Sequence, residues 1–105
     1  MSRYIIVGTY SDVGAAGLVS GDSDRVEAMG TLCNSVGATL VSADITRGQY
    51  DFCIIVEADS FAVVAAMLLK VRATGAAGEI ITLEAVDYQE IRSVAKGVNY
   101  TPPSG

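Results

Sequence analysis

The sequence predicts an α+β domain in which helices cover one face of a four-stranded antiparallel sheet. Three observations lead to this prediction. The chain has 105 residues, a length typical of a single domain. Hydrophobic residues make up 50% of it and charged residues 18%, which is typical of a folded protein and not of a disordered tail. Strand-like and helix-like patterns follow one another in the order β-α-β-β-α-β.

The first element is a strand. Residues 4–10 are rich in β-branched and aromatic side chains and are apolar on both faces, which is typical of a central strand covered on both sides. Residues 11–21 contain few large apolar side chains and no periodicity. We expect a loop or a weakly helical lead-in there.

A helix and a hairpin follow. Asp22 or Ser23 is suited to cap the helix, and Gly37 ends it. Within the helix, apolar side chains recur at helical spacing: Val26, Met29, Cys33 and Val36. Residues 38–45 alternate as a strand and, through a tight connection at 46–49, form a hairpin with a third strand at 51–58.

The remaining elements complete the pattern. Ser60 caps a second helix, which Gly75 ends. Residues 79–86 form a fourth strand, and Asp87 caps a short terminal helix that runs to residue 96. Two βαβ crossovers in this order predict a ferredoxin-like domain over residues 1–98, with a flexible tail at 99–105.

A sheet with helices on one face leaves the other face open. We assign to this open face one alternating set from each strand. In the third strand the more apolar set, Phe52, Ile54, Val56 and Ala58, is assigned to the helices. In the first strand we assign the tyrosines to the open face, since tyrosine prefers a position where its hydroxyl group reaches water. The predicted open-face residues are Tyr4, Ile6, Gly8, Tyr10, Leu40, Ser42, Asp44, Asp51, Cys53, Ile55, Glu57, Ile80, Thr82 and Glu84.

This predicted face is too apolar to remain in water. We therefore expect it to pair with a second copy, with Ile6, Leu40, Cys53, Ile55 and Ile80 as interface residues. The composition independently favours self-association, because a domain of this size buries only about two thirds of its chain's surface.

Several motifs resemble those of the GYD-domain family. They are Tyr10-Ser11-Asp12-x-Gly14, Arg25, Gly37 and, most specifically, Gly48-Gln49-Tyr50-Asp51 followed by the strand at 52–58. The resemblance covers roughly residues 4–95, and the chain departs from it at 14–21 and at Cys53. It implies a prokaryotic, cytoplasmic protein of the dimeric α+β-barrel type, from a family without a generally established activity.

Three carboxylates are the candidates for catalysis: Glu57, Glu84 and Asp51. A carboxylate on a half-apolar face has its charged form disfavoured, which suits acid–base work, although either glutamate could equally reach solvent at a strand end. Asp51 could bind backbone N–H groups or pair with Arg47.

Candidate ligand-binding residues are Tyr4, Tyr10, Asp12, Arg47 and Tyr50. We take the strands at 4–10 and 51–58 as a parallel pair. On that basis Tyr10 and Asp12 lie at the opposite end of the sheet from Tyr50 and Asp51.

Other chemistry finds little support in the sequence. There is no histidine, and no Asp-x-Asp spacing supports a metal site, so we predict neither a metal nor a cofactor. The two cysteines, Cys33 and Cys53, are read as free, reduced thiols, with Cys33 in the core. Cys53 lacks an evident activator, and packing is the simpler interpretation of it.

Two functions remain in competition. The first is an interaction or assembly module that pairs through its open sheet face. The alternative is a small-molecule-binding protein or cofactor-free enzyme with its site in a dimer cavity. The net charge of −5 argues against nucleic acid as a partner, and no apolar stretch is long enough to span a membrane. We expect a cytoplasmic homodimer or higher homo-oligomer.

Overall fold

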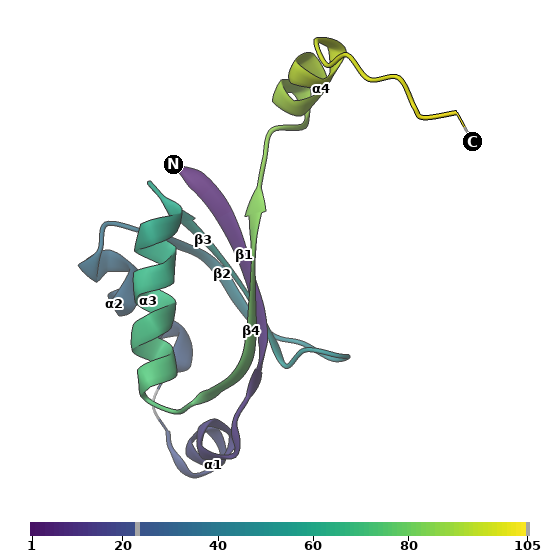
Figure 1. Cartoon of the computed structure of the whole chain (residues 1–105). Coiled ribbons are helices and arrows are strands. Elements are labelled where there is room, and N and C mark those ends of the chain that lie inside the picture. The colour runs from purple at the N-terminus through teal and green to yellow at the C-terminus, as the bar shows by residue number, and fades with distance from the viewer. Residues whose placement is uncertain (23, 105) are drawn as a thin grey trace.

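The computed structural model describes residues 1–22 and 24–104. Its sheet is antiparallel, has the strand order β2-β3-β1-β4, and consists of β1 (Ser2–Tyr10), β2 (Thr39–Ile45), β3 (Phe52–Ala58) and β4 (Ala77–Ala85). Figure 1 shows α2 (Arg25–Ser35) and α3 (Phe61–Ala73) on one side of this sheet. The predicted ferredoxin-like α+β fold is confirmed.

The helices begin where the sequence offers capping side chains. Ser60 accepts a hydrogen bond from the Val63 N–H at the start of α3, and Asp87 accepts one from the Gln89 N–H at the start of α4 (Tyr88–Lys96). Both caps were predicted. At the start of α2 the cap is Asp24, whose carboxylate accepts from the N–H groups of Val26 and Glu27. The prediction that Asp22 or Ser23 caps this helix is wrong for Asp22, and Ser23 lies outside the described residues.

One helix was not clearly predicted. The segment after β1 forms α1 (Asp12–Ser20), although it carries no apolar stripe. Its start is stabilised by Ser11, whose hydroxyl accepts from the Gly14 N–H at 3.1 Å. The amide N–H of Ser11 in turn donates to the Ala76 carbonyl at 3.1 Å. The contact of α1 with the loop before β4 therefore stabilises this helix, although it has no apolar stripe.

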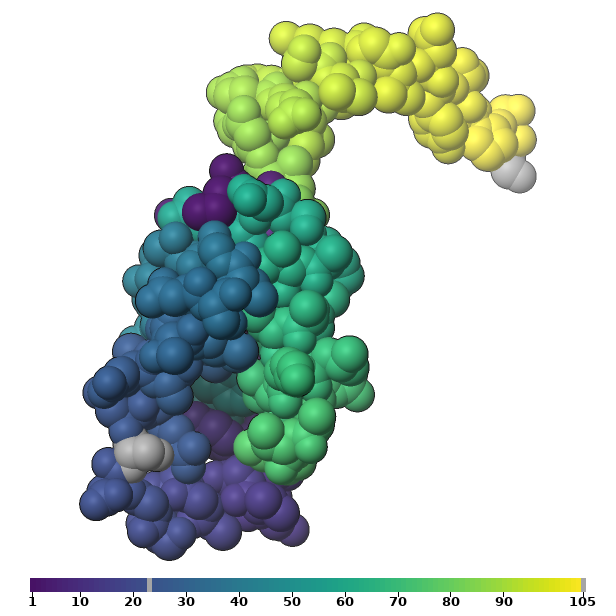
Figure 2. All heavy atoms as spheres, turned by 90° about the vertical axis from the view of Figure 1, so that its left-hand side faces the viewer, coloured from purple at the N-terminus to yellow at the C-terminus, as the bar shows by residue number. Residues whose placement is uncertain are grey.

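The core lies between the sheet and the two helices α2 and α3. Its centre contains fully or almost fully buried side chains from the two inner strands and from both helices: Tyr4, Ile6, Cys33, Val56, Val64 and Met67. The ring of Tyr4 lies 6.3 Å from that of Phe61 at the start of α3. Figure 2 shows α2 and α3 covering this face of the sheet.

The C-terminal segment leaves this body. Figures 1 and 2 show α4 projecting beyond the end of β4, with the tail continuing away from it. The chain measures 59 × 35 × 22 Å and has a radius of gyration of 17.5 Å. A compact chain of this length has a radius of gyration of about 13 Å. The predicted tail at 99–105 is exposed over residues 99–104, and Gly105 lies outside the described residues.

Candidate functional site

The end of β1 meets the start of β3 at a junction rich in hydrogen bonds. The Asp51 carboxylate accepts from the Tyr10 amide N–H at 3.0 Å, and the Asp51 N–H donates to the Gly8 carbonyl at 2.8 Å. The predicted parallel pairing of these strands is wrong, because β1 and β3 are antiparallel. Tyr10 and Asp51, predicted to lie apart, are direct neighbours.

Packing reinforces this junction. The rings of Tyr10 and Phe52 lie 5.3 Å apart at 48°. On the hairpin side, Thr46 donates its hydroxyl to the Tyr50 carbonyl at 2.6 Å, and Gly48 adopts a φ of +131°, a conformation that favours glycine. Of the two roles considered for Asp51, the structure shows the backbone-binding one. The geometry of the turn and of the strand junction explains these contacts.

We expect Asp51→Ala to lower the free energy of unfolding by about 1–2 kcal/mol, because the Tyr10 N–H loses a charged acceptor in a half-buried place. Urea denaturation followed by circular dichroism measures this loss. Asp59→Ala, at an exposed position, is the matched control and should change stability by less than about 0.5 kcal/mol. Equal effects of the two substitutions would contradict the structural role of Asp51.

The other predicted ligand-binding residues do not gather around this junction as one site. Asp12 and Arg47 are exposed, and Tyr50 is half-buried in the hairpin. Tyr4 is 2% exposed and belongs to the core, so its predicted position on the open face is wrong. A tyrosine fits this interior because its ring packs against Phe61.

The candidate catalytic carboxylates are also separated. Glu57 lies opposite Arg3 in the β1–β3 register and forms an ion pair with it at 4.0 Å. Glu84 lies opposite Tyr4 in the β1–β4 register, and directly opposed residues share a face. Glu84 is therefore on the helix side of the sheet and not on the open face as predicted. The structure does not bring Glu57, Glu84 and Asp51 together into an acid–base site.

The open face of the sheet is the second candidate region. Its centre, which we call the apolar centre, consists of Ile5, Val7, Cys53, Ile55, Ile81 and Leu83. These residues alternate with the buried set that contains Ile6 and Val56, and they are half-buried or exposed. The rim is more polar, since β2 contributes Ser42 and Asp44, and the Arg3–Glu57 pair lies toward one end.

The predicted membership of this face was correct for β3 and wrong for much of the rest. Cys53 and Ile55 lie there, whereas Ile6 belongs to the core, and Leu40 and Ile80 pack against the core on the helix side. Gly8, Tyr10 and Thr82 also belong to the set opposite the open face. In β2 a register shift after Leu40 returns Ser42 and Asp44 to the open face.

Four members of the apolar centre were missed: Ile5, Val7, Ile81 and Leu83. In β1 a signal was present. The set that contains Ile5 and Val7 also contains Arg3 and Thr9, and it is therefore the more polar of the two. Polarity predicts that this set lies on the open face. The preference of the tyrosine hydroxyl for water had instead assigned the set with Tyr4 and Tyr10 to that face.

The two cysteines differ in environment. Both are free thiols. Cys33 is fully buried, and desolvation raises its thiol pKa, so the neutral form is favoured in the folded state. The contribution of this thiol to the free energy of unfolding is therefore complete at pH values below the ordinary thiol pKa. It is lost as the pH rises above that pKa. Cys53 is half-buried within the apolar centre.

Across residues 1–22 and 24–104, no three His, Cys, Asp or Glu side chains are grouped so that they could hold a metal ion. In the same part of the chain, no helix has both the length and the apolar character needed to cross a bilayer.

Comparison with known proteins places this fold in context. The chain is similar to the crystal structure of FFRP-DM1, with a TM-score of 0.53, 20% identity, and coverage of 82% of this chain and 100% of that one. A hypothetical protein from Pyrococcus horikoshii has a TM-score of 0.52 and 16% identity, with 82% of this chain and 90% of that chain covered. These similarities show the fold alone.

A search of curated proteins finds no match. The GYD domain model, in contrast, matches residues 4–95, which include the Gly48–Asp51 hairpin and both strands of the junction. The chain belongs to the GYD-domain family.

Proposed function

We propose that this chain is an assembly module that pairs with a second copy of itself through its open sheet face. The observation that supports this proposal most directly is the apolar centre. Ile5 and Val7 of β1 lie beside Ile55 and Cys53 of β3 on one side, and beside Leu83 and Ile81 of β4 on the other. Leu83 is 52% exposed. Such a contiguous apolar surface is unfavourable in water.

The total surface of the chain supports the same proposal. The chain exposes 7393 Å². A compact monomer of its mass exposes about 5,600 Å², which leaves an excess of about 1,800 Å². A stable interface of standard size covers about 800 Å² on each partner. The excess, part of which comes from the projecting C-terminal segment, is therefore large enough for an extensive interface.

A second copy is the occupant that the face itself favours. A two-fold pairing places the same patch on both partners, so an apolar centre meets an apolar centre and a polar rim meets a polar rim. The charges of Arg3 and Glu57 balance within one copy, so they add no net repulsion between two. Two sheets packed face to face lie about 10 Å apart, a distance that Ile, Leu and Val side chains fill.

Sedimentation velocity over protein concentrations from nanomolar to high micromolar tests this proposal. We expect a dimer at micromolar concentration and dissociation on dilution. A monomer at every concentration would overturn the proposal.

We also propose a reducing, cytoplasmic setting, which is supported by the two free thiols of Cys33 and Cys53.

A further inference from the structure

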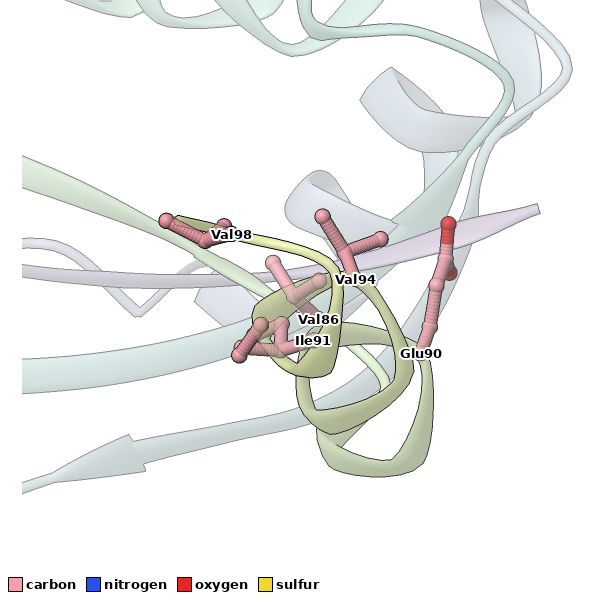
Figure 3. A pocket seen from close by; sticks show the side chains of 6 residues that line it. Val86, Glu90, Ile91, Val94 and Val98 are labelled. Carbon is pink, nitrogen blue, oxygen red and sulfur yellow. The ribbon is translucent and has the colours of Figure 1, made fainter. Parts of the chain in front are cut away.

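The helix α4 presents an apolar surface that its own chain leaves uncovered. Figure 3 shows Val86, Ile91, Val94 and Val98 around this surface, with Glu90 at its edge. Ile91 is 55% exposed and Val94 66%, and no residue of α4 is buried. A helix of nine residues without tertiary contacts is marginally stable in water. The surface, which we call the α4 stripe, therefore needs a partner.

A second uncovered apolar surface lies between α3 and β4. It is a groove of about 370 Å³, lined mainly by Phe61, Leu68, Leu69 and Ile80, with Arg72 at the C-terminal end of α3. Phe61 is 57% exposed and Leu69 68%. The strand β4 is at the edge of the sheet, so no further strand closes this side of the groove.

We infer that the α4 stripe of one copy packs into the α3–β4 groove of a second copy. The two surfaces match in chemistry. Each is apolar with one charge at its margin, and the charges are opposite: Glu90 beside the stripe and Arg72 beside the groove. An ion pair at the margin of an apolar contact adds mainly orientation and specificity.

The placement of α4 favours a second copy over the chain's own groove. Figure 1 shows α2 and α3 on one side of the sheet. In the same view α4 lies beyond the end of β4, and the tail runs toward the opposite side, where the partner of the open face would lie. The helix continues away from β4 instead of turning back along it.

This inference rests on the proposed self-association, and disulfide cross-linking tests it separately. In a Cys53→Ala background, one batch carries Val94→Cys and the other Leu69→Cys; the batches are mixed and oxidised. We expect a covalent heterodimer, because only an intermolecular contact joins the two batches. Replacing Leu69→Cys with Ala66→Cys, an exposed position on α3 outside the groove, is the control and should give little product.

Three cross-linking outcomes would overturn the inference. The first is a failure of Val94→Cys and Leu69→Cys to cross-link. The second is cross-linking of Val94→Cys only with itself, which would indicate pairing of α4 with α4. The third is a disulfide within one chain of the doubly substituted protein, which would place α4 in its own groove.

Dimer affinity provides the second readout. Val94→Asp should raise the dimer Kd by at least about tenfold, since it puts a carboxylate into an apolar contact. Ser93→Asp, on the opposite side of α4, should leave the Kd within about twofold. Glu90→Arg should weaken the dimer, and Arg72→Glu added to it should restore affinity. A wild-type monomer would refute the proposed function, whereas a dimer that Val94→Asp leaves unchanged would refute only this inference.

Discussion

Replacing Ile55 with aspartate is expected to convert the proposed dimer into a folded monomer. Ile55 lies at the middle of the apolar centre, with Ile5 opposite it on β1 and Ser42 on β2. In the monomer its side chain is half-buried and the carboxylate retains access to water. In the proposed dimer the same carboxylate would lie between two apolar sheet surfaces. An unpaired charge in such a place costs about 3–5 kcal/mol, which corresponds to an increase in Kd of at least about 100-fold.

Sedimentation velocity measures this change, and circular dichroism reports whether the variant folds. Val26→Asp is the matched control, because Val26 is 52% exposed at the start of α2, on the helix side of the molecule. It should leave the Kd unchanged within about twofold. Leu83→Asp, at the edge strand, is a second variant that should weaken the proposed dimer without touching a central strand. Wild-type affinity in both open-face variants would contradict the sheet-to-sheet interface.

Alanine substitutions at two helical glycines are expected to have opposite effects on stability. A Cβ atom added at Gly14 would lie 2.0 Å from the Ala76 carbonyl oxygen, because α1 packs directly on the loop before β4. Gly14→Ala must separate these segments and break the hydrogen bond from the Ser11 N–H to Ala76. Forcing an extra methyl group into a closed contact costs about 1–3 kcal/mol.

Gly30 is the control for this effect. It lies inside α2, and apart from its chain neighbours and the helix's own nearby backbone a Cβ atom there would meet no heavy atom within 4 Å. Gly30→Ala should therefore raise the free energy of unfolding by about 0.5–1 kcal/mol, through the higher helix propensity of alanine. Thermal and urea denaturation of both variants measure the difference. Stabilisation by Gly14→Ala would show that α1 does not pack on the loop at Ala76.

The candidate site could be predicted only in part, and β1 shows why. Both alternating sets of β1 contain large apolar side chains, so hydrophobicity alone leaves the two phases almost equal. A shift by one residue exchanges the two faces completely. Pairing decides the phase: Tyr4 lies opposite Val56, which the amphipathic pattern of β3 had placed toward the helices. Once β1 is oriented, its register with β4 orients Ile80 and Ile81 as well.

Asp51 illustrates a second limit. Its residue type and its place in a turn left two roles open, accepting backbone N–H bonds or pairing with Arg47. Which N–H group it binds depends on the direction of the neighbouring strand, and this follows from the chain topology. With β1 and β3 antiparallel, the acceptor at the start of β3 meets the Tyr10 donor at the end of β1.

The sequence by itself determined the properties that depend on neighbouring residues. These are the order of the strands and main helices, the caps at Ser60 and Asp87, the turn at Gly48, and the amphipathic phase of β3. Tertiary structure decided which faces of β1 and β4 cover the core, that α1 forms against the loop at Ala76, and that α4 projects from the body. The physical reason is the sequence distance between the groups that interact. Caps and turns form their hydrogen bonds within a few residues, whereas strand register and helix docking depend on partners far away in the chain.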